Sequence, residues 1–519
     1  MAGDDLEMTL GDVVTDNAVR FPDVPAYRLG SRMVTHAHLR DRAVRLVSAM
    51  ATAGVRRQDR VAVLSRNSVE FGEVMAATHL SGIVLATVNF RLSSGEMLDV
   101  LKRVTPSIVF CSDEFASVLT ELGSQLPSAP LLVCIGASGR TGMVDFEEFV
   151  AGGDGAQLAF AARPDDIACL LFTSGTTGTS KCCIHGQAEM RRVAFSMNVE
   201  MRAGSSDRGL INMPMFHFGA MAIIGGLHAR GGTVVLQQQF DASEAIRMIP
   251  DERLSVLHLA PVMLRALLDE VNDARDLDSV RTVVYSAAPI TAVTLERAMS
   301  TLLNAGFLNL YGQTEAIVSG LPRELHTIDG PGSPEALRSV GFPFPGVRVR
   351  IVSDDGREVP RGEPGEVVVR SDSVFRGYWD DPAATLATLR DGWCYTGDLG
   401  RWDERGLLYL VDRKKDIIIT GGENVYSPEV ENVLTGLDGI AACAVVGAPD
   451  GKWGEAVCAV VVPTAGAGLT LEAIRDGARS ALAGYKLPRR LVIVDELPQL
   501  ASGKVDKKRL RADMEGRGA

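Results

Sequence analysis

Residues 173–181 read TSGTTGTSK and combine glycines, hydroxyl side chains and a lysine in one short segment. A strand-like run at 168–172 leads directly into it. Gly175 and Gly178 permit backbone angles that let several N–H groups converge on an anion, and Lys181 adds a positive charge. The spacing differs from the usual nucleotide loop, G-x-x-x-x-G-K-[ST]. By itself, the segment leaves both a turn and a phosphate-binding loop open.

Four later segments also place charged or hydroxyl side chains beside glycines. They read YGQTE at 311–315, YTGDLG at 395–400, DRKKDIIITGGENVYSPEVE at 412–431 and LASGKVDKKRL at 500–510. Taken singly, each has an ordinary interpretation: a solvated Glu315, a turn aspartate at Asp398, or an exposed lysine in a basic tail at Lys504. Their joint occurrence in this order is more informative than any one of them.

In this order and at these separations the five segments resemble the adenylate-forming superfamily, specifically its acyl-CoA synthetases. The resemblance runs from about residue 10 to residue 510. It implies that the first segment binds ATP, and it implies a nucleotide site made of Thr173, Ser174, Gly175, Thr176, Thr177, Gly178, Lys181, Ala287, Ala288, Pro289, Tyr311, Gly312, Gln313, Asp398 and Arg413. Within that set, Tyr311 would stack near adenine, and Asp398 would accept both ribose hydroxyls with support from Arg413.

The implied chemistry activates a carboxylate with ATP and then passes the acyl group from acyl-AMP to a thiol. The first step brings two anions together, so a cation between them and fixed donors at phosphorus are required. Lys504 matches the lysine of a mobile C-terminal domain that takes this role, and Thr314 matches an α-phosphate contact. Glu315 matches the ligand of Mg²⁺, which needs only one or two protein carboxylates.

Further positions follow from the same resemblance. Lys415 falls at the hinge about which the C-terminal domain rotates, while Gly421 and Gly422 would flank the channel for coenzyme A. Trp453, within APDGKWGEAV, is either a wall of that channel or a core residue. The sequence departs from the family pattern at three positions. The end of the phosphate loop has Ser180 and Cys182 where proline and glycine are common, and Cys394 stands where a bulkier apolar residue is usual. None of these departures removes a predicted ligand of phosphate, magnesium or ribose.

The region 213–232, MPMFHFGAMAIIGGLHARGG, matches the part of the family that bears an aromatic gate and the acyl pocket. The predicted pocket residues are His217, Phe218, Gly219, Met221 and Ile317. Residues 316–321, AIVSGL, add more apolar wall and contain no lysine or arginine to pair a second carboxylate. We therefore expect a monocarboxylic acid with a fatty, branched or aromatic tail. The prediction is an ATP-dependent acid–CoA ligase. An enzyme that loads a carrier-protein phosphopantetheine and a non-catalytic nucleotide-binding regulator remain alternatives.

The surrounding elements predict an α/β fold. Apolar residues recur at helical spacing in 35–54 and 69–80, and short apolar strands stand at 59–65 and 82–89, which indicates parallel pairing through crossover helices. The pattern resumes from 231, where Asp241 and Glu244 suggest a capping box. Short strands follow from 347. We therefore predict an N-terminal domain at 1–411, layered and with a β-rich subdomain, and a small mobile α+β domain at 412–519.

Composition limits the possible partners. The chain of 519 residues is 46% hydrophobic and carries 65 acidic against 53 basic residues, a net charge of −12. This balance disfavours a nucleic-acid partner. No signal peptide or membrane helix is indicated, so we expect a cytoplasmic protein with reduced thiols at its eight cysteines. A homodimer, the acid's identity and the pathway are left open.

Overall fold

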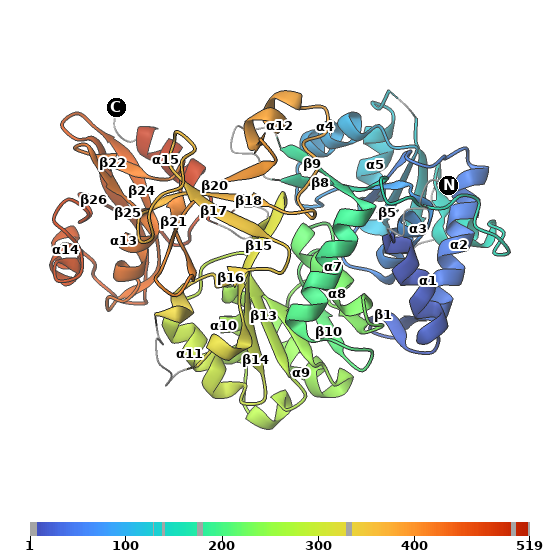
Figure 1. Ribbon diagram of the computed structural model, residues 1–519, viewed down its shortest axis with the longest axis horizontal. Coiled ribbons are helices and arrows are strands. Elements are labelled where there is room, and N and C mark those ends of the chain that lie inside the picture. The colour runs from blue at the N-terminus through green and yellow to red at the C-terminus, as the bar shows by residue number, and fades with distance from the viewer. Residues whose placement is uncertain are drawn as a thin grey trace. The chain divides into compact units, whose positions relative to one another are not determined.

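The computed structural model describes residues 8–127, 129–136, 141–173, 180–327, 335–499 and 505–516. Contacts divide the chain into two compact units (Figure 1). The first comprises Met1–Thr173, Ser180–Arg348 and Val369–Cys394, and the second comprises Ser174–Thr179, Val349–Val368 and Tyr395–Ala519. The predicted boundary between residues 411 and 412 remains a prediction.

A seven-stranded sheet forms one layer of the first unit. Its strands, in spatial order, are β7 (Val144–Asp145), β6 (Leu131–Ile135), β5 (Ile108–Ser112), β3 (Arg60–Leu64), β4 (Val84–Thr87), β8 (Ile167–Thr173) and β9 (Lys181–Gly186). The predicted parallel pairing is confirmed for β3 with β4 and for β4 with β8. Helix α3 (Val69–Ser81) makes the crossover, and the apolar run of β3 is buried on both faces, as parallel strands require.

A nine-stranded sheet forms the other layer. Its order is β16 (Phe342–Pro343), β15 (Ala316–Leu321), β14 (Gly306–Gln313), β13 (Thr282–Ser286), β12 (Val256–Leu259), β10 (Arg208–Ile211), β11 (Thr233–Leu236), β1 (Pro25–Leu29) and β2 (Arg32–Thr35). Strands β10 to β14 pair in parallel, whereas β14 and β15 form an antiparallel hairpin. The carboxyl ends of β13 and β14 therefore lie side by side, where α/β sheets bind ligands.

Helices cover both sheets. They are α1 (Leu10–Arg20), α2 (His36–Thr52), α4 (Ser94–Val104), α5 (Ala116–Gly123), α6 (Phe146–Ala151), α7 (Gln187–Met201), α8 (Phe218–His228), α9 (Ala242–Glu252), α10 (Pro261–Asp269), α11 (Ala292–Thr301) and α12 (Pro382–Thr388). Helices α7 and α8 run side by side in the view of Figure 1. Their close approach depends on Gly225, because a Cβ there would lie 2.9 Å from that of Ala194.

Only one of the two hydrogen bonds of the predicted capping box at α9 is formed. Asp241 does cap the helix, accepting from the Glu244 backbone N–H at 2.7 Å. The Glu244 carboxylate, however, accepts from the Gln237 amide at 2.6 Å instead of returning to Asp241. A buried amide at the end of β11 competes for this carboxylate, a tertiary contact that the local pattern does not reveal.

The second unit contains most of a five-stranded sheet and all of another. The first has β17 (Arg348–Val352), β18 (Gly365–Arg370), β19 (Leu389–Arg390), β20 (Trp393–Trp402) and β21 (Leu408–Arg413). The other has β22 (Ile418–Thr420), β23 (Glu423–Val425), β24 (Ile440–Asp450), β25 (Gly454–Pro463) and β26 (Arg490–Ile493), covered by α13 (Ser427–Leu434), α14 (Leu471–Ala478) and α15 (Lys507–Gly516). The predicted short strands after 347 and the smaller α+β C-terminal domain are thus confirmed, whereas its start at residue 412 and its mobility remain predictions.

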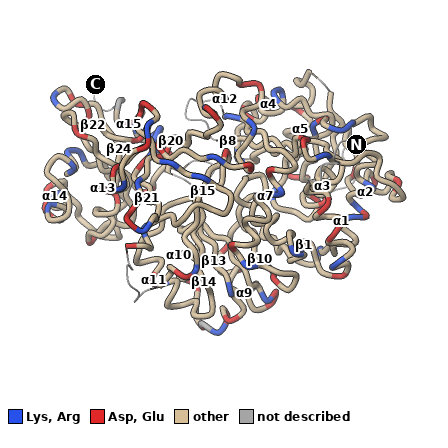
Figure 2. Tube along the Cα trace, in the orientation of Figure 1, with Lys and Arg blue, Asp and Glu red and all other residues tan. Residues whose placement is uncertain are grey.

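Basic and acidic residues are interspersed along the chain in both units (Figure 2). None of the eight cysteines forms a disulfide, and all except Cys443 are buried. In the described ranges, every helix is too short or too polar to pass through a lipid bilayer.

Candidate active site

The predicted phosphate loop is framed by two antiparallel strands. Thr173, the last residue of β8, pairs with Lys181, the first residue of β9, and its Oγ1 donates to the Lys181 carbonyl at 3.4 Å. The predicted ligands Ser174, Gly175, Thr176, Thr177 and Gly178 lie outside the described residues, so their contacts with ATP remain predictions. The frame confirms that a strand leads directly into the loop.

One face of β9 carries three polar or polarisable side chains. Lys181, Cys183 and His185 alternate along the strand and therefore point to the same side. The Lys181 ammonium lies 4.6 Å from the centre of the Tyr378 ring, a favourable cation–π distance. Cys183 is fully buried, pairs with Tyr378 in an isolated bridge, and packs in one apolar cluster with it and the unusual Cys394. This face of β9 points to Tyr378 as an element of the site.

Glu315 is a buried carboxylate on a two-residue turn between β14 and β15. Its Oε1 accepts a hydrogen bond from the Tyr378 hydroxyl at 2.6 Å, and its carbonyl accepts from the Phe375 N–H at 2.9 Å. Burial, followed by the charge of Glu315, raises the pKa of Tyr378, so the phenol stays protonated and donates. The carboxylate is thereby fixed in one orientation.

The donor set at Glu315 fits magnesium. No other protein hydrogen bond from the described residues reaches Oε2, so one oxygen of the carboxylate is held while the other is available. In the described part of the chain no cluster of three His, Cys, Asp or Glu forms an all-protein metal cage. Mg²⁺ is commonly held by one carboxylate together with phosphate oxygens and waters, which is the kind of site that Glu315 offers.

The segment after β13 lies at the same sheet edge. Ser286 pairs with Leu310, so Ala287, Ala288 and Pro289 leave the sheet near Tyr311. All three are exposed, and Ala287 has a φ of +73°, a left-handed conformation that costs about 1–3 kcal/mol for a residue with a side chain. Such strain gathers at ligand-binding segments, which supports the predicted adenine contact.

The three predicted nucleotide residues on β14 differ in exposure. Tyr311 is buried, Gly312 is exposed and Gln313 is half-buried. A Cβ on Gly312 would lie 2.8 Å from the Ala316 carbonyl, so the hairpin requires glycine there. The hairpin thus brings Gln313 and Thr314 to the sheet edge where Ala287 stands.

The predicted acyl region surrounds the start of α8. His217 is half-buried and precedes the helix, and Phe218 is buried with its ring stacked on His185 at 5.0 Å. At Gly219 a Cβ would meet only His258, at 3.9 Å. Met221 lines a separate cavity of about 40 Å³ with residues of α1 and α3, room for about one water. Ile317 is buried on β15. An acyl contact by Met221 or Ile317 remains a prediction.

In the second unit Asp398 and Arg413 face each other across β20 and β21. Their strands pair at these residues, and the Arg413 Nε lies 3.1 Å from Asp398 Oδ1. Asp398 is buried whereas Arg413 is half-exposed. The structure therefore brings together the two residues predicted to bind ribose, with a carboxylate oriented by a guanidinium.

Charged residues on both sides of the predicted hinge, Lys415, are anchored. Asp412 accepts from the Ser427 N–H at 2.7 Å, Lys414 pairs with Asp354 at 2.7 Å, and Asp416 pairs with Arg511 at 2.8 Å. Lys415 is exposed and makes no ion pair within the described chain. The lack of an ion pair in the described chain is compatible with a hinge at Lys415, and the hinge remains a prediction.

Trp453 is half-buried beside the two glycines predicted for the coenzyme A channel. The Gly421 N–H donates to the Trp453 carbonyl at 2.8 Å, and Gly422 is exposed. The Arg489 guanidinium lies 4.4 Å and the Lys452 ammonium 4.9 Å from the centre of the indole ring. Two cations thus lie against a partly exposed aromatic ring, and a role for Trp453 in the coenzyme A channel remains a prediction.

Lys504 lies outside the described residues. Gln499 and Val505, which flank residues 500–504, pair in an antiparallel bridge. Beyond them Lys507 donates to Ser427 Oγ at 2.6 Å and pairs with Glu431 at 2.7 Å. Both ends of the segment that contains Lys504 are thus attached to the second unit, while its catalytic role remains a prediction.

Two residues of the site, Tyr378 and His185, are not predicted from the sequence. Tyr378 belongs to FRGYWDD, where nothing in the local pattern links it to Glu315, 63 positions away. His185 could have been found, because Lys181, Cys183 and His185 alternate on one face of a strand. A histidine at that spacing after the predicted phosphate loop is the signal.

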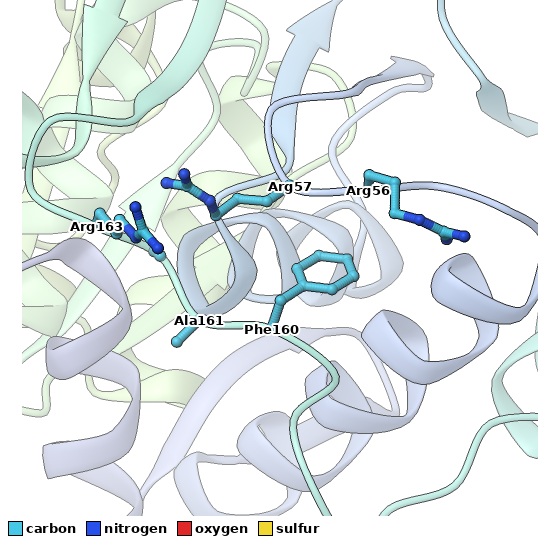
Figure 3. A pocket seen from close by; sticks show the side chains of 6 residues that line it. Arg56, Arg57, Phe160, Ala161 and Arg163 are labelled. Carbon is cyan, nitrogen blue, oxygen red and sulfur yellow. The ribbon is translucent and has the colours of Figure 1, made fainter.

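A second recess lies elsewhere on the first unit (Figure 3). It has a volume of about 480 Å³ and is lined by Arg56, Arg57, Phe160, Ala161, Ala162 and Arg163. Arg57 is paired with the buried Asp166, and the Arg56 side chain donates to the Val55 carbonyl at 3.2 Å. Figure 3 shows Arg56 directed away from Arg57 and Arg163. Arg57 thus joins two chain segments, and none of the predicted site residues lines the recess.

Comparison with known proteins gives a consistent result. The model of the AMP-binding enzyme family matches residues 14–379, and that of the AMP-binding enzyme C-terminal domain matches residues 429–504. The chain is 34% identical to a feruloyl-CoA synthase from an Amycolatopsis species, covering 97% of this chain and 98% of that one. It is also 34% identical to the fatty acid–[acyl-carrier-protein] ligase ScoC of Streptomyces coeruleorubidus, covering 97% and 96%. The ATP-bound crystal structure of MatB from Rhodopseudomonas palustris superimposes with a TM-score of 0.89 at 27% identity, covering 99% of this chain and 100% of that one.

Proposed function

The chain belongs to the family of AMP-binding enzymes, and from this premise we propose that it joins a carboxylic acid to coenzyme A at the expense of ATP. The observation that carries the proposal is the buried Glu315 carboxylate, held by Tyr378 on the turn after the predicted nucleotide segment YGQ. A buried and oriented carboxylate at the carboxyl edge of a parallel sheet suits a nucleotide with its metal. Two relatives of this chain are named for an aromatic acid, ferulic acid, and for fatty acids.

In the first step a carboxylate oxygen of the acid attacks the α-phosphorus of ATP, and pyrophosphate leaves with the bonding electrons. Lys504 would lie between the two anions, and Thr314 would contact the α-phosphate. Mg²⁺, held by Glu315 when bound, would neutralise charge on the phosphates. Asp398, oriented by Arg413 at 3.1 Å, would hold the ribose and so fix the distance between the reacting atoms.

In the second step the thiolate of coenzyme A attacks the acyl carbon, and AMP leaves with the oxygen that came from the acid. We propose that the C-terminal domain, 412–519, rotates about Lys415 between the two steps. Gly421, Gly422 and Trp453 would then line the thiol channel. The cations beside Trp453 support this role, because coenzyme A carries phosphates as well as an adenine base.

The acid is proposed to be a monocarboxylate with an apolar tail. Around the start of α8 the side chains are apolar or neutral: Phe218 is buried, and burial lowers the pKa of the adjacent His258 to about 4. No cation lies in the predicted pocket set to pair a second carboxylate. Feruloyl and fatty acyl groups, which name two relatives, both fit this class.

A carrier-protein acceptor is the second candidate, because ScoC is named for transfer to acyl carrier protein. The discriminating experiment offers coenzyme A and a phosphopantetheinylated carrier protein in parallel, with the best acid from a panel. Faster transfer to coenzyme A supports the proposal, and faster transfer to the carrier replaces it. Binding of ATP without pyrophosphate release for any acid would instead support the nucleotide-binding regulator. A cytoplasmic location and a homodimer remain predictions.

A further inference from the structure

His185 is a fully buried side chain that the proposed reaction does not use. It stands on β9 four residues after Lys181, and its relative exposure is 0%. One edge of the ring reaches the turn that carries Glu315, with Nε2 2.8 Å from the Thr314 carbonyl oxygen. One face stacks on Phe218, with ring centres 5.0 Å apart and planes at 23°. The ring thus touches both the predicted metal turn and the predicted acyl helix.

The geometry determines which nitrogen of His185 carries the proton. A carbonyl oxygen can only accept, so Nε2 must be protonated and donate to Thr314. Nδ1 is then the unprotonated nitrogen, and it has no partner among the described residues. With its one N–H committed and no solvent contact, His185 is poorly placed to exchange protons with a substrate. Its remaining capacity is to hold the turn.

The turn needs such a donor. Gln313 and Ala316 are the last paired residues of the β14–β15 hairpin, so Thr314 and Glu315 leave the ladder. Buried carbonyls outside a ladder must find donors elsewhere. The Glu315 carbonyl finds Phe375 N–H at 2.9 Å, the carboxylate finds the Tyr378 hydroxyl at 2.6 Å, and the Thr314 carbonyl finds His185. Three donors from outside the hairpin therefore fix both residues of the turn.

We propose that His185 is a positioning residue that orients the Glu315 carboxylate towards the metal of ATP by holding the Thr314 carbonyl, and that its contact with Phe218 joins this turn to the acyl side of the site. The inference rests on the proposed function, in which Glu315 binds magnesium. Without the His185 donor the carbonyl of the half-buried Thr314 loses its protein partner, and the turn that carries the carboxylate loses one of its three external restraints. Because Glu315 is proposed to bind the metal, loss of this hydrogen bond should lower the affinity for magnesium–ATP.

The test compares three variants. His185→Leu fills the space with an apolar side chain and removes the donor. His185→Gln supplies an amide N–H of similar reach, whereas the amide N–H of His185→Asn is too short to reach the Thr314 carbonyl. Pyrophosphate release is measured against Mg²⁺ concentration at saturating ATP. We expect His185→Leu and His185→Asn to need about tenfold more Mg²⁺ for half-maximal rate, the loss of about one buried hydrogen bond, and His185→Gln to recover most of it.

The second readout does not depend on turnover. The rise in melting temperature caused by Mg²⁺–ATP should shrink in His185→Leu and His185→Asn and be restored in His185→Gln. His326→Leu is the matched control, because His326 is also buried and contacts a carbonyl, that of Pro322 at 2.9 Å. It should lower the melting temperature and leave the Mg²⁺ requirement unchanged.

Unchanged Mg²⁺ dependence in His185→Leu and His185→Asn would overturn the inference, as would a His185→Gln variant no better than His185→Asn. If His185→Leu does not accumulate as folded protein, the comparison of the glutamine and asparagine variants decides. A wild-type protein that releases no pyrophosphate with any acid would refute the proposed function. The thermal shifts would then still show whether His185 controls binding of Mg²⁺–ATP.

Discussion

The Tyr378 hydroxyl donates a 2.6 Å hydrogen bond to Oε1 of Glu315, joining two residues 63 positions apart in the chain. If this contact orients the carboxylate for magnesium, Tyr378→Phe should slow pyrophosphate release about tenfold at low Mg²⁺ and less at high Mg²⁺. A hydrogen bond to a charged group is worth about 1.5–3 kcal/mol, and a tenfold effect, about 1.4 kcal/mol, lies at the lower end of that range. The measurement is the initial rate across a Mg²⁺ series.

The control for this variant is Tyr285→Phe, which removes another buried hydroxyl, bonded to His326 at 2.9 Å. It should lose stability but keep the wild-type Mg²⁺ requirement. Equal shifts in both variants would show that Tyr378 contributes only to folding.

Asp398→Asn should raise the KM for ATP about 10- to 100-fold. The change removes the charge that would accept two ribose hydroxyls, while a charge-assisted hydrogen bond contributes about 1.5–3 kcal/mol. Because Arg413 is half-exposed, it can turn to water once its 3.1 Å partner is neutral, so folding should be little affected. Asp355→Asn, which breaks an exposed pair with Arg357, should leave KM unchanged. A wild-type KM in Asp398→Asn would remove the ribose assignment.

The first unit should be destabilised by mild acid. Burial lowers the pKa of six histidines from 6.5 to about 4, and in one case to about 3: His36, His79, His185, His228, His258 and His326. The unfolded chain takes up protons at these groups below about pH 6.5 and the folded chain does not until about pH 4. The free energy of unfolding therefore falls as pH decreases through that window, by about 2 kcal/mol for each group at pH 5.

The second unit provides an internal control, because every histidine of the sequence belongs to the first unit. Calorimetric scans between pH 7.5 and 5 should show one transition that moves strongly with pH and another that does not. Carboxylates titrate mostly below this window, near pH 4. Two transitions that move together would contradict the assignment to buried histidines.

Gly421→Ala should impair thioester formation more than adenylation. A Cβ there would lie 2.8 Å from Trp453 Cε3, so the methyl group must displace the indole ring. Gly466→Ala is a control outside the predicted channel: its φ of +82° imposes a comparable backbone cost, but no described atom lies within 4 Å of a Cβ there. Acyl-CoA formation from supplied acyl-AMP should fall in the first variant relative to the second, and pyrophosphate release should be similar in both. Equal rates of thioester formation would exclude Trp453 from the thiol path.

The sequence predicts the fold and the site best where each follows from a local pattern of residues. The parallel crossover β3–α3–β4 follows from periodicity, and the motif order singles out Asp398 and Arg413, which the structure brings together across β20 and β21. It fails where a side chain takes a partner that the local pattern does not single out, seven residues away in one case and 129 in another. The Glu244 carboxylate turns to Gln237, Tyr378 reaches Glu315, and His185 reaches Thr314. Local propensity carries no information about such partners, because tertiary packing selects them.

The central claim is that the acid is activated as an acyl-adenylate and then released to coenzyme A. The direct measurement uses an acid labelled with ¹⁸O in its carboxylate, together with ATP, Mg²⁺ and coenzyme A, and follows the label by mass spectrometry. The attacking carboxylate oxygen stays on phosphorus when the thiolate displaces AMP, so we predict AMP carrying a single ¹⁸O and an equal amount of acyl-CoA. Unlabelled AMP, or ADP and phosphate as products, would contradict the claim.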